Sequence, residues 1–262
     1  MSGSRSERTA VTEPGTATAT PESASDLTPF ISGTALAART VLRCLTRVRV
    51  EGPLDRIPKD GPLIIAANHL SNADGPVVGG WLTPALGRRI HWLGKREMFE
   101  WPLIGRAFRA GSVHPVDRGG ADVEAFRTAE RILEAGNVLL VFPEGTRSTT
   151  GGLARPRDGL ALLALRTGAP ILPVGVAGTD QLWPRGGWPH PGGRVVLRVG
   201  EAFTLAEALG SEAVDRRRAK ALATDAIMRR IAALLPPRHR GVYAEETPSE
   251  AGGEPGPAGG ST

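Results

Sequence analysis

Residues 63–76 read Leu-Ile-Ile-Ala-Ala-Asn-His-Leu-Ser-Asn-Ala-Asp-Gly-Pro, an apolar run that passes directly into a polar turn. The first five of these residues follow Gly61-Pro62 and have the length and composition of a buried strand. The turn after them carries His69 and Asp74. Sites in α/β proteins collect at the carboxyl ends of strands, so this junction is where we first expect functional groups.

The segments that follow alternate between the two kinds of secondary structure. Apolar runs bounded by turn residues predict further strands, at residues 90–93, 112–116, 138–142, 170–176 and 194–199. Amphipathic segments that end near Gly or Pro predict helices, at residues 121–135, 160–166 and 211–235. This alternation is typical of a single α/β domain with a mostly parallel central sheet flanked by helices.

Composition separates the ends of the chain from its middle. The chain has 262 residues, of which 40% are hydrophobic, enough for one sizeable core. Both ends are rich in Gly, Pro, Ser and Thr, a composition that buries too little apolar surface to offset the entropy of ordering. We therefore predict disordered tails over residues 1–28 and 241–262, and one folded domain over residues 51–240.

The net charge and the low aromatic content narrow the class of binding partner. A net charge of +5 and a pI near 10.2 favour anionic partners such as nucleic acid, acidic lipid headgroups or phosphorylated cofactors. Aromatic residues make up only 5% of the chain and no nucleic-acid-binding module is recognisable, so we expect no nucleic-acid partner.

The single cysteine excludes an internal disulfide and fits a reducing compartment. No signal peptide is apparent and no run of about 18 apolar residues occurs, so we expect a peripheral membrane protein if it meets a membrane at all.

Residues 29–50 show helical periodicity and predict an amphipathic helix ahead of the domain. Arg39, Arg43 and Arg47 are four residues apart and form a basic stripe beside the apolar face. Such a helix suits the interface of a membrane that contains anionic lipids, although a core-facing helix with a solvated basic side has the same pattern. Cys44 lies on this helix without a partner nearby in the sequence, so we interpret it as a buried or interfacial thiol rather than an acyl-carrying nucleophile.

His69 and Asp74 are the sharpest chemical feature of the sequence. In one continuous helix they would point about 140° apart, but Ser71, Asn72 and other turn formers between and after them allow a loop to bring them together. An imidazole oriented by a carboxylate is a general base that needs only a substrate hydroxyl. Asp74 is also placed to cap a helix that begins at Gly75. The pair alone is equally compatible with a structural role.

Two further segments bring polar groups to neighbouring strand ends. The apolar run at residues 138–142 is followed by Glu144-Gly145-Thr146-Arg147, and the strand predicted at 112–116 is followed by Arg118. Glycine lets a ligand approach the backbone, threonine offers a hydroxyl, and arginine offers a planar fork for phosphate. Two arginines at adjacent strand ends beside a possible base form a plausible phosphate clamp.

Together these segments resemble the PlsC-type glycerolipid acyltransferases, a family that includes the 1-acylglycerol-3-phosphate acyltransferases. The resemblance covers about residues 50–180. The family's first block is an asparagine-led His-x4-Asp motif, the HX4D motif, and it is matched by Asn68, His69 and Asp74.

The other family blocks follow in order. Arg118 matches the second, Phe142 to Ser148 reproduce the third intact, and Ile171-Leu172-Pro173-Val174 match the fourth. One position departs from the pattern. Many members have Phe-Lys-x-Gly shortly after the third block, where this chain has Arg157 in place of the lysine, which leaves the choice of acceptor open.

The resemblance implies a fatty acyl transfer in phospholipid biosynthesis, from an acyl-CoA or acyl-carrier-protein thioester to a lysophospholipid. The acceptor would be 1-acylglycerol-3-phosphate and the product phosphatidate, with another lysolipid, a non-phospholipid alcohol or a catalytically idle lipid-binding protein as alternatives. His69 and Asp74 would be the catalytic pair. Five residues would bind the acceptor: Arg118, Glu144, Gly145, Thr146 and Arg147. No cofactor and no metal are expected, since the remaining histidines lack paired ligand spacing, and the expected location is the cytoplasmic face of the cell membrane.

Overall fold

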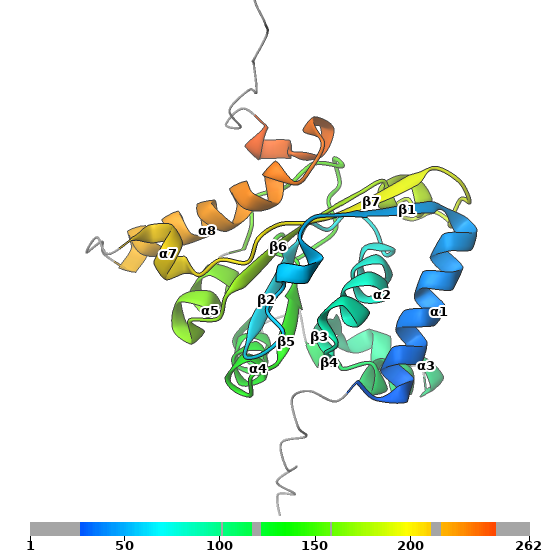
Figure 1. Cartoon of the computed structure of the whole chain (residues 1–262), viewed down its shortest axis with the longest axis horizontal. Coiled ribbons are helices and arrows are strands. Elements are labelled where there is room, and N and C mark those ends of the chain that lie inside the picture. The colour runs from blue at the N-terminus through cyan, green and yellow to red at the C-terminus, as the bar shows by residue number, and fades with distance from the viewer. Residues whose placement is uncertain (1–26, 101, 117–121, 158, 211–215, 245–262) are drawn as a thin grey trace, which may run out of the picture.

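A central sheet with helices on both faces makes up the domain (Figure 1). The computed structural model describes residues 27–100, 102–116, 122–157, 159–210 and 216–244. The fold is therefore the α/β architecture predicted from the alternating segments, with a helix ahead of the sheet.

The sheet has seven strands in the order β1-β7-β6-β2-β5-β3-β4. Their bounds are β1 Arg47–Glu51, β2 Leu63–Ala67, β3 Ile90–Lys95, β4 Val113–Val116, β5 Val138–Val141, β6 Ile171–Ala177 and β7 Arg194–Val199. The strands from β6 to β4 all run in one direction, whereas β7 is antiparallel to β6 and β1 is parallel to β7. The prediction of a mostly parallel sheet is confirmed.

Helices cover both faces of this sheet (Figure 1). Their bounds are α1 Pro29–Leu45, α2 Asp74–Leu86, α3 Pro102–Ala110, α4 Asp122–Glu134, α5 Gly159–Thr167, α6 Thr179–Leu182, α7 Leu205–Leu209 and α8 Arg216–Ala233. Helices α4, α5, α7 and α8 contribute to the core on one face, and α1, α2 and α6 to the core on the other. None of the helices in the described part of the chain has the length and apolarity needed to cross a membrane.

The strand at the centre of the sheet fixes the position of the turn that follows it. All five residues of β2 are fully buried. Ile64 and Ala66 pack toward α5 and α8, whereas Leu63, Ile65 and Ala67 pack toward α1 and α2. Burial of one isoleucine side chain contributes about 1.5–3 kcal/mol to stability, so β2 is held firmly in place and positions the turn that follows it.

The reversal of β7 brings additional segments to the edge where the parallel strands end. After β6 the chain turns at Gly178, whose φ is +86°, and a Cβ at this position would come within 2.1 Å of the carbonyl oxygen of Arg194. The last residue of β6, Ala177, pairs with Val196 near the beginning of β7. The starts of β7 and β1 therefore lie at the same edge as the carboxyl ends of β2, β5 and β6.

The helix predicted over residues 29–50 is shorter than expected. It ends at Leu45, and residues 47–51 form β1, which pairs with β7 along its whole length. The sequence Arg-Val-Arg-Val-Glu alternates with a period of two, which is the pattern of a strand with one buried side. Arg47 therefore belongs to the sheet and not to the basic stripe of the helix.

The described residues also correct the predicted tail at the carboxyl end. Residues 241–243 form a 3-10 turn, and the N–H of Val242 donates to the carbonyl oxygen of Leu153. The predicted tail therefore does not begin at residue 241. Residues 1–26, 211–215 and 245–262 lie outside the described residues. They include parts of both predicted tails and the start of the long helix predicted at 211–235.

Candidate active site

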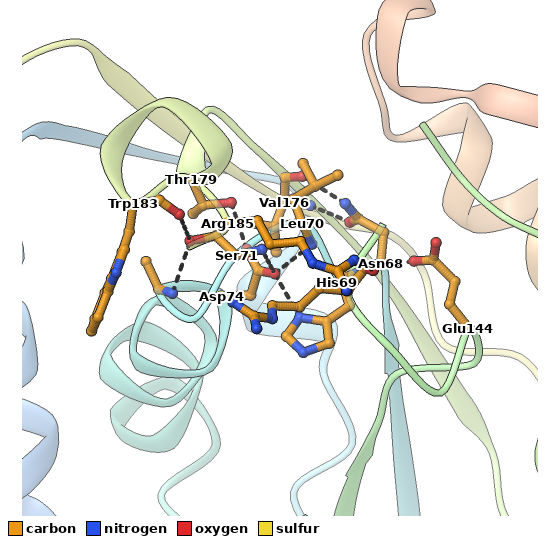
Figure 2. A network of polar contacts seen from close by, with 12 residues as sticks. Asn68, His69, Leu70, Ser71, Asp74, Glu144, Val176, Thr179, Trp183 and Arg185 are labelled. Atoms are coloured by element: carbon orange, nitrogen blue, oxygen red, sulfur yellow. Dashed lines mark hydrogen bonds and ion pairs between the residues drawn. The ribbon is translucent and has the colours of Figure 1, made fainter. Parts of the chain in front are cut away.

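The turn after β2 brings His69 and Asp74 together, as Figure 2 shows. Nδ1 of His69 lies 2.8 Å from Oδ2 of Asp74. The carboxylate comes from the first residue of α2 and is completely buried, whereas 19% of the His69 side chain is exposed. The prediction that a loop folds Asp74 back toward the imidazole is confirmed.

Both carboxylate oxygens of Asp74 are held by donors. Oδ2 accepts the backbone N–H groups of Leu70 at 2.6 Å and of Ser71 at 2.7 Å in addition to His69, and Oδ1 accepts the hydroxyl of Thr179. These four contacts hold the carboxylate in one position. The suggested capping of α2 by Asp74 is wrong, because the helix begins at Asp74 itself and no side chain caps its N-terminus. Asp74 instead binds the turn that precedes it.

The imidazole of His69 is fixed by its contacts and open on one side. Its ring stacks on Phe142 with 4.0 Å between the centroids and 14° between the planes. With Nδ1 turned to Asp74, no hydrogen-bond partner for Nε2 is found among the described residues. A neutral imidazole with its proton on Nδ1 would present the Nε2 lone pair outward, which is the arrangement of a general base.

Three side chains tie this turn to neighbouring elements through contacts that the sequence analysis did not predict. The Asn68 amide donates to the carbonyl oxygen of Val176 on β6 at 2.8 Å and accepts the N–H of the same residue at 2.7 Å. The hydroxyl of Ser71 donates to the carbonyl oxygen of Trp183 at 2.7 Å. Thr179 reaches Asp74 from the start of α6. The strand end is thus anchored on the β6 side by buried polar contacts.

Glu144 anchors the same turn on the β5 side. Its side chain is buried, Oε1 accepts the N–H of His69 at 2.8 Å, and Oε2 accepts the N–H of Ala154 at 3.0 Å. Burial raises the pKa of Glu144, and the two N–H donors partly counter that shift. Both oxygens are used within the protein, so these contacts give Glu144 a positioning role, while its predicted contact with substrate stays a prediction.

Replacing Glu144 by glutamine is expected to disturb the site more than its small change in shape suggests. Each carboxylate oxygen faces a backbone N–H that can only donate, so the new NH2 group would face a donor in either orientation. An unsatisfied buried donor costs about 1–3 kcal/mol. We expect E144Q to lower the free energy of unfolding by that amount, as measured by chemical denaturation. For the acyl transfer that the sequence resemblance implies, we expect a kcat about tenfold lower in a thiol-release assay. Wild-type stability and activity in E144Q would contradict the positioning role.

The rest of the predicted phosphate loop follows Glu144 at the same edge. Gly145 has a φ of +69°, a backbone conformation that favours glycine, and a Cβ there would come 2.7 Å from the side chain of Arg157. Thr146 is exposed and Arg147 half-buried. The carbonyl oxygen of Arg147 accepts a hydrogen bond from Arg185 at 3.2 Å.

The predicted substrate-binding set is only partly visible. Arg118 lies outside the described residues. The expectation that Arg118 and Arg147 follow adjacent strands is wrong, because β3 lies between β4 and β5 in the sheet. Gly145, Thr146 and Arg147 are connected to the turn of His69 and Asp74 through Ser148, whose N–H donates to the carbonyl oxygen of His69 at 2.8 Å. Their binding of phosphate stays a prediction.

The remaining histidines lie in different surroundings. Nδ1 of His91 is 2.9 Å from Nε2 of His114, and burial together with the neighbouring His114 lowers the pKa of His91 to about 4. His239 is buried, and its Nδ1 contacts the carbonyl oxygen of Gly151 in the loop after residue 148. Within the part of the chain that the structure describes, no group of three or more His, Cys, Asp or Glu residues is arranged to hold a metal.

Comparison with known proteins places this arrangement in a family. A family model described as Acyltransferase matches residues 47–177. A 1-acyl-sn-glycerol-3-phosphate acyltransferase of Pseudomonas aeruginosa is 29% identical over 171 residues, which are 64% of this chain and 63% of the relative. The chloroplastic 1-acyl-sn-glycerol-3-phosphate acyltransferase LPAT1 of Arabidopsis thaliana is 28% identical over 173 residues, which are 64% of this chain and 47% of the relative. The chain therefore spans less than two thirds of the length of these curated relatives.

A solved structure shares the fold. The crystal structure of the 1-acyl-sn-glycerophosphate acyltransferase PlsC from Thermotoga maritima matches with a TM-score of 0.63 and 26% sequence identity, over 78% of this chain and 79% of that one. The family match includes β1, the His69–Asp74 turn, the loop at Glu144 and the whole of β6. On the strength of this match, which spans half of its length, the chain belongs to the acyltransferase family.

Proposed function

We propose that this protein transfers a fatty acyl group from an acyl thioester to the free hydroxyl of a lysophospholipid, with 1-acylglycerol-3-phosphate as acceptor and phosphatidate as product. The observation that carries the proposal is the contact between His69 and Asp74 at the carboxyl end of β2. The names of the relatives support the choice of acceptor, since both the P. aeruginosa and the A. thaliana proteins are 1-acyl-sn-glycerol-3-phosphate acyltransferases.

The geometry supports a direct transfer between the two substrates. Nε2 of His69 would remove the proton of the acceptor hydroxyl as its oxygen attacks the thioester carbonyl carbon. Asp74 would keep the proton of the imidazole on Nδ1 and stabilise the imidazolium that forms. When the tetrahedral intermediate collapses, the carbon–sulfur bond breaks and the imidazolium proton passes to the leaving thiolate. The nucleophile is the alcohol of the substrate, so no serine or cysteine of the protein is needed.

The phosphate of the acceptor would bind beside this pair. Arg147 and the backbone at Gly145 follow β5, the neighbour of β2, at the same sheet edge. Arg118 follows β4, which is three strands from β2, so the segment after β4 and the arginine side chain would have to reach back toward His69 to bind the same phosphate. A guanidinium group matches the geometry of a phosphate with two parallel hydrogen bonds. In this proposal Glu144 holds the loop in place and Thr146 adds a hydroxyl donor.

The reaction would take place on a membrane surface, where both acyl chains reside, and the donor would be acyl-CoA or an acyl-carrier-protein thioester. Helix α1 exposes large apolar side chains, namely Phe30, Leu36 and Val41. The guanidinium groups of Arg39 and Arg43 lie over the ring of Trp81 on α2, at 5.8 and 5.9 Å from its centroid. The helix therefore packs on α2 through part of its basic stripe and leaves apolar side chains outside, as an interfacial helix does. We place it at the cytoplasmic face of the cell membrane.

A panel of acceptors tests the substrate. Thiol release from an acyl-CoA is measured with 1-acylglycerol-3-phosphate and with the matching 1-acylglycerol, which lacks the phosphate. A charge-assisted contact contributes about 1.5–3 kcal/mol, so we expect kcat/KM to be about 10- to 100-fold higher with the phosphate. Equal values would exclude recognition of the phosphate, and no release with any lysolipid or alcohol would exclude the proposed activity.

A further inference from the structure

A basic cavity lies at the sheet edge that carries the catalytic turn, on the side of β1. Its volume is about 600 Å³, and it is formed where α1 ends and where β1 and β7 begin. Its walls include Arg43, Cys44, Thr46, Arg47, Gly192 and Arg194. Neither the sequence motifs nor the proposed reaction assigns it a role.

The charge of this cavity is positive and unopposed. Within the described residues, the guanidinium groups of Arg43, Arg47 and Arg194 form no ion pair with a carboxylate, and the recorded contact of Arg43 is with the ring of Trp81. Arg47 and Arg194 are paired in register at the start of β1 and β7, so their backbones are held side by side.

The helix end that borders the cavity does not cancel this charge. The carboxyl terminus of a helix carries about half a negative charge, which is small beside three guanidinium groups. Two of its last carbonyl oxygens are also satisfied inside the protein. That of Leu42 accepts the N–H of Thr46 at 2.8 Å, and that of Leu45 accepts the N–H of Gly192 at 2.6 Å.

The arginines give this cavity the donor groups of a phosphate site. A guanidinium group matches the geometry of a phosphate with two parallel hydrogen bonds. Thr46 also borders the cavity, but its hydroxyl is enclosed by the protein without a hydrogen-bond partner, so the arginines are the donors that a bound anion would meet.

The cavity is too far from His69 to hold the phosphate of the reacting acceptor. In the sheet, β1 is three strands away from β2, which corresponds to about 14 Å at about 4.8 Å per strand. In 1-acylglycerol-3-phosphate the free hydroxyl and the phosphate are on neighbouring carbon atoms. An anion bound in the cavity would therefore belong to another molecule.

Exposed apolar side chains on the segments that lead to the cavity indicate which kind of molecule would bind there. Trp188 is 84% exposed and lies in the loop that leads to the cavity wall at Gly192. Val41, one turn before the wall residue Cys44 on α1, is 56% exposed. A tryptophan exposed beside cationic side chains is typical of a protein surface in contact with a membrane, where the ring sits at the level of the headgroups.

We propose that the cavity formed by Arg43, Thr46, Arg47 and Arg194 binds the headgroup phosphate of an anionic phospholipid that is not a substrate, and so docks the catalytic edge of the sheet on the membrane. This inference rests on the membrane-surface part of the proposed function and extends it with a defined second lipid site. It also orients the enzyme, because the cavity and the catalytic turn open at the same edge of the sheet.

The test uses the single cysteine of the chain as a reporter at the cavity wall. Cys44 is exposed, so the rate of its alkylation by N-ethylmaleimide is measurable in the unaltered protein. We expect phosphatidylcholine vesicles with about 20 mol% phosphatidylglycerol to slow alkylation at least about fivefold. Pure phosphatidylcholine vesicles, inorganic phosphate or adenosine 3′,5′-bisphosphate, the thiol-free nucleotide part of coenzyme A, should leave the rate unchanged at the same phosphate concentration. Equal protection by either soluble phosphate compound would overturn the proposal in favour of a site for a soluble phosphate.

A charge variant and a matched control complete the test. Basic residues near an anionic surface contribute about 1 kcal/mol each, so R47Q/R194Q should weaken sedimentation with the anionic vesicles by about 30-fold. The control R127Q/R131Q removes the same charge from exposed positions of α4 and should weaken it less than threefold. Equal losses of vesicle binding in the two variants would overturn the proposal, because the attraction to the membrane would then depend on the total charge of the protein and not on the cavity.

A further arm separates this inference from the proposed function. With an acceptor dispersed in detergent, R47Q/R194Q should keep the wild-type rate of thiol release. A wild-type protein without acyltransferase activity would remove the proposed function, while the alkylation and sedimentation results would still decide the lipid site. If R47Q/R194Q also releases thiol slowly in detergent, the cavity takes part in the reaction itself, and the proposal that it binds a lipid that is not a substrate is overturned.

Discussion

Replacement of His69 by alanine is expected to lower the kcat of acyl transfer by about 10²- to 10⁴-fold, the range that a positioned general base contributes. The imidazole is the basic group beside Asp74 whose Nε2 is open to a substrate. Its removal leaves the acceptor hydroxyl to lose its proton to water. The rate of thiol release from an acyl-CoA, with saturating 1-acylglycerol-3-phosphate, measures this effect.

The fold should survive the loss of His69. The side chain is partly exposed, and its removal gives up mainly the stacking on Phe142, which is worth about 0.5–1.5 kcal/mol. The control H190A removes an exposed histidine from the loop before β7 and should keep the wild-type rate. Turnover in H69A within tenfold of the wild type, with an intact fold, would contradict the role of His69 as base.

Replacement of Asp74 by asparagine is expected to remove the charge while leaving the geometry almost unchanged. The amide oxygen can occupy the position of Oδ2 and accept from Leu70, Ser71 and His69, while the amide nitrogen occupies the position of Oδ1. There it faces the hydroxyl of Thr179, which can rotate and accept instead of donating. Glu144 has no such partner, because both of its oxygens face backbone N–H groups.

The catalytic effect of D74N should therefore report the charge itself. Without the carboxylate the imidazolium formed in the transition state loses its counter-charge, and we expect kcat to fall by about 10²- to 10³-fold, with about 1.4 kcal/mol for each factor of ten. The free energy of unfolding should fall less than in E144Q. The comparison variant T179V removes the partner of Oδ1 but keeps the charge, and it should lose about tenfold at most. A rate for D74N at or above that of T179V would contradict the electrostatic role of Asp74.

The sequence predicts those elements whose signals are local. The run at residues 63–67 is continuous, apolar and bounded by Gly-Pro, and it forms β2 over these same residues. The segment at residues 194–199 is likewise observed with its predicted bounds as β7. In contrast, only one residue separates α1 from β1. The predicted helix therefore extended too far and included a strand whose residues alternate with a period of two.

The supports of the site could not be found in the same way because their partners are distant in the sequence. Asn68 binds Val176 across 108 residues, and Thr179 binds Asp74 across 105. The direction of β7 is also a tertiary property, since its alternating residues fit either orientation beside β6. The arginine cavity depends on the direction of β7 as well, because it forms only where β1 and β7 start beside the end of α1.

The direct transfer to a substrate hydroxyl is tested most simply with an acceptor that lacks it. Thiol release from an acyl-CoA by the wild-type protein is compared between 1-acylglycerol-3-phosphate and its analogue without the hydroxyl at carbon 2. With the first, we predict one phosphatidate, identified by mass spectrometry, for each thiol released. With the analogue we predict no release above the background without enzyme. Equal release with both compounds would contradict the assignment, since His69 and Asp74 would then activate water and the protein would hydrolyse thioesters.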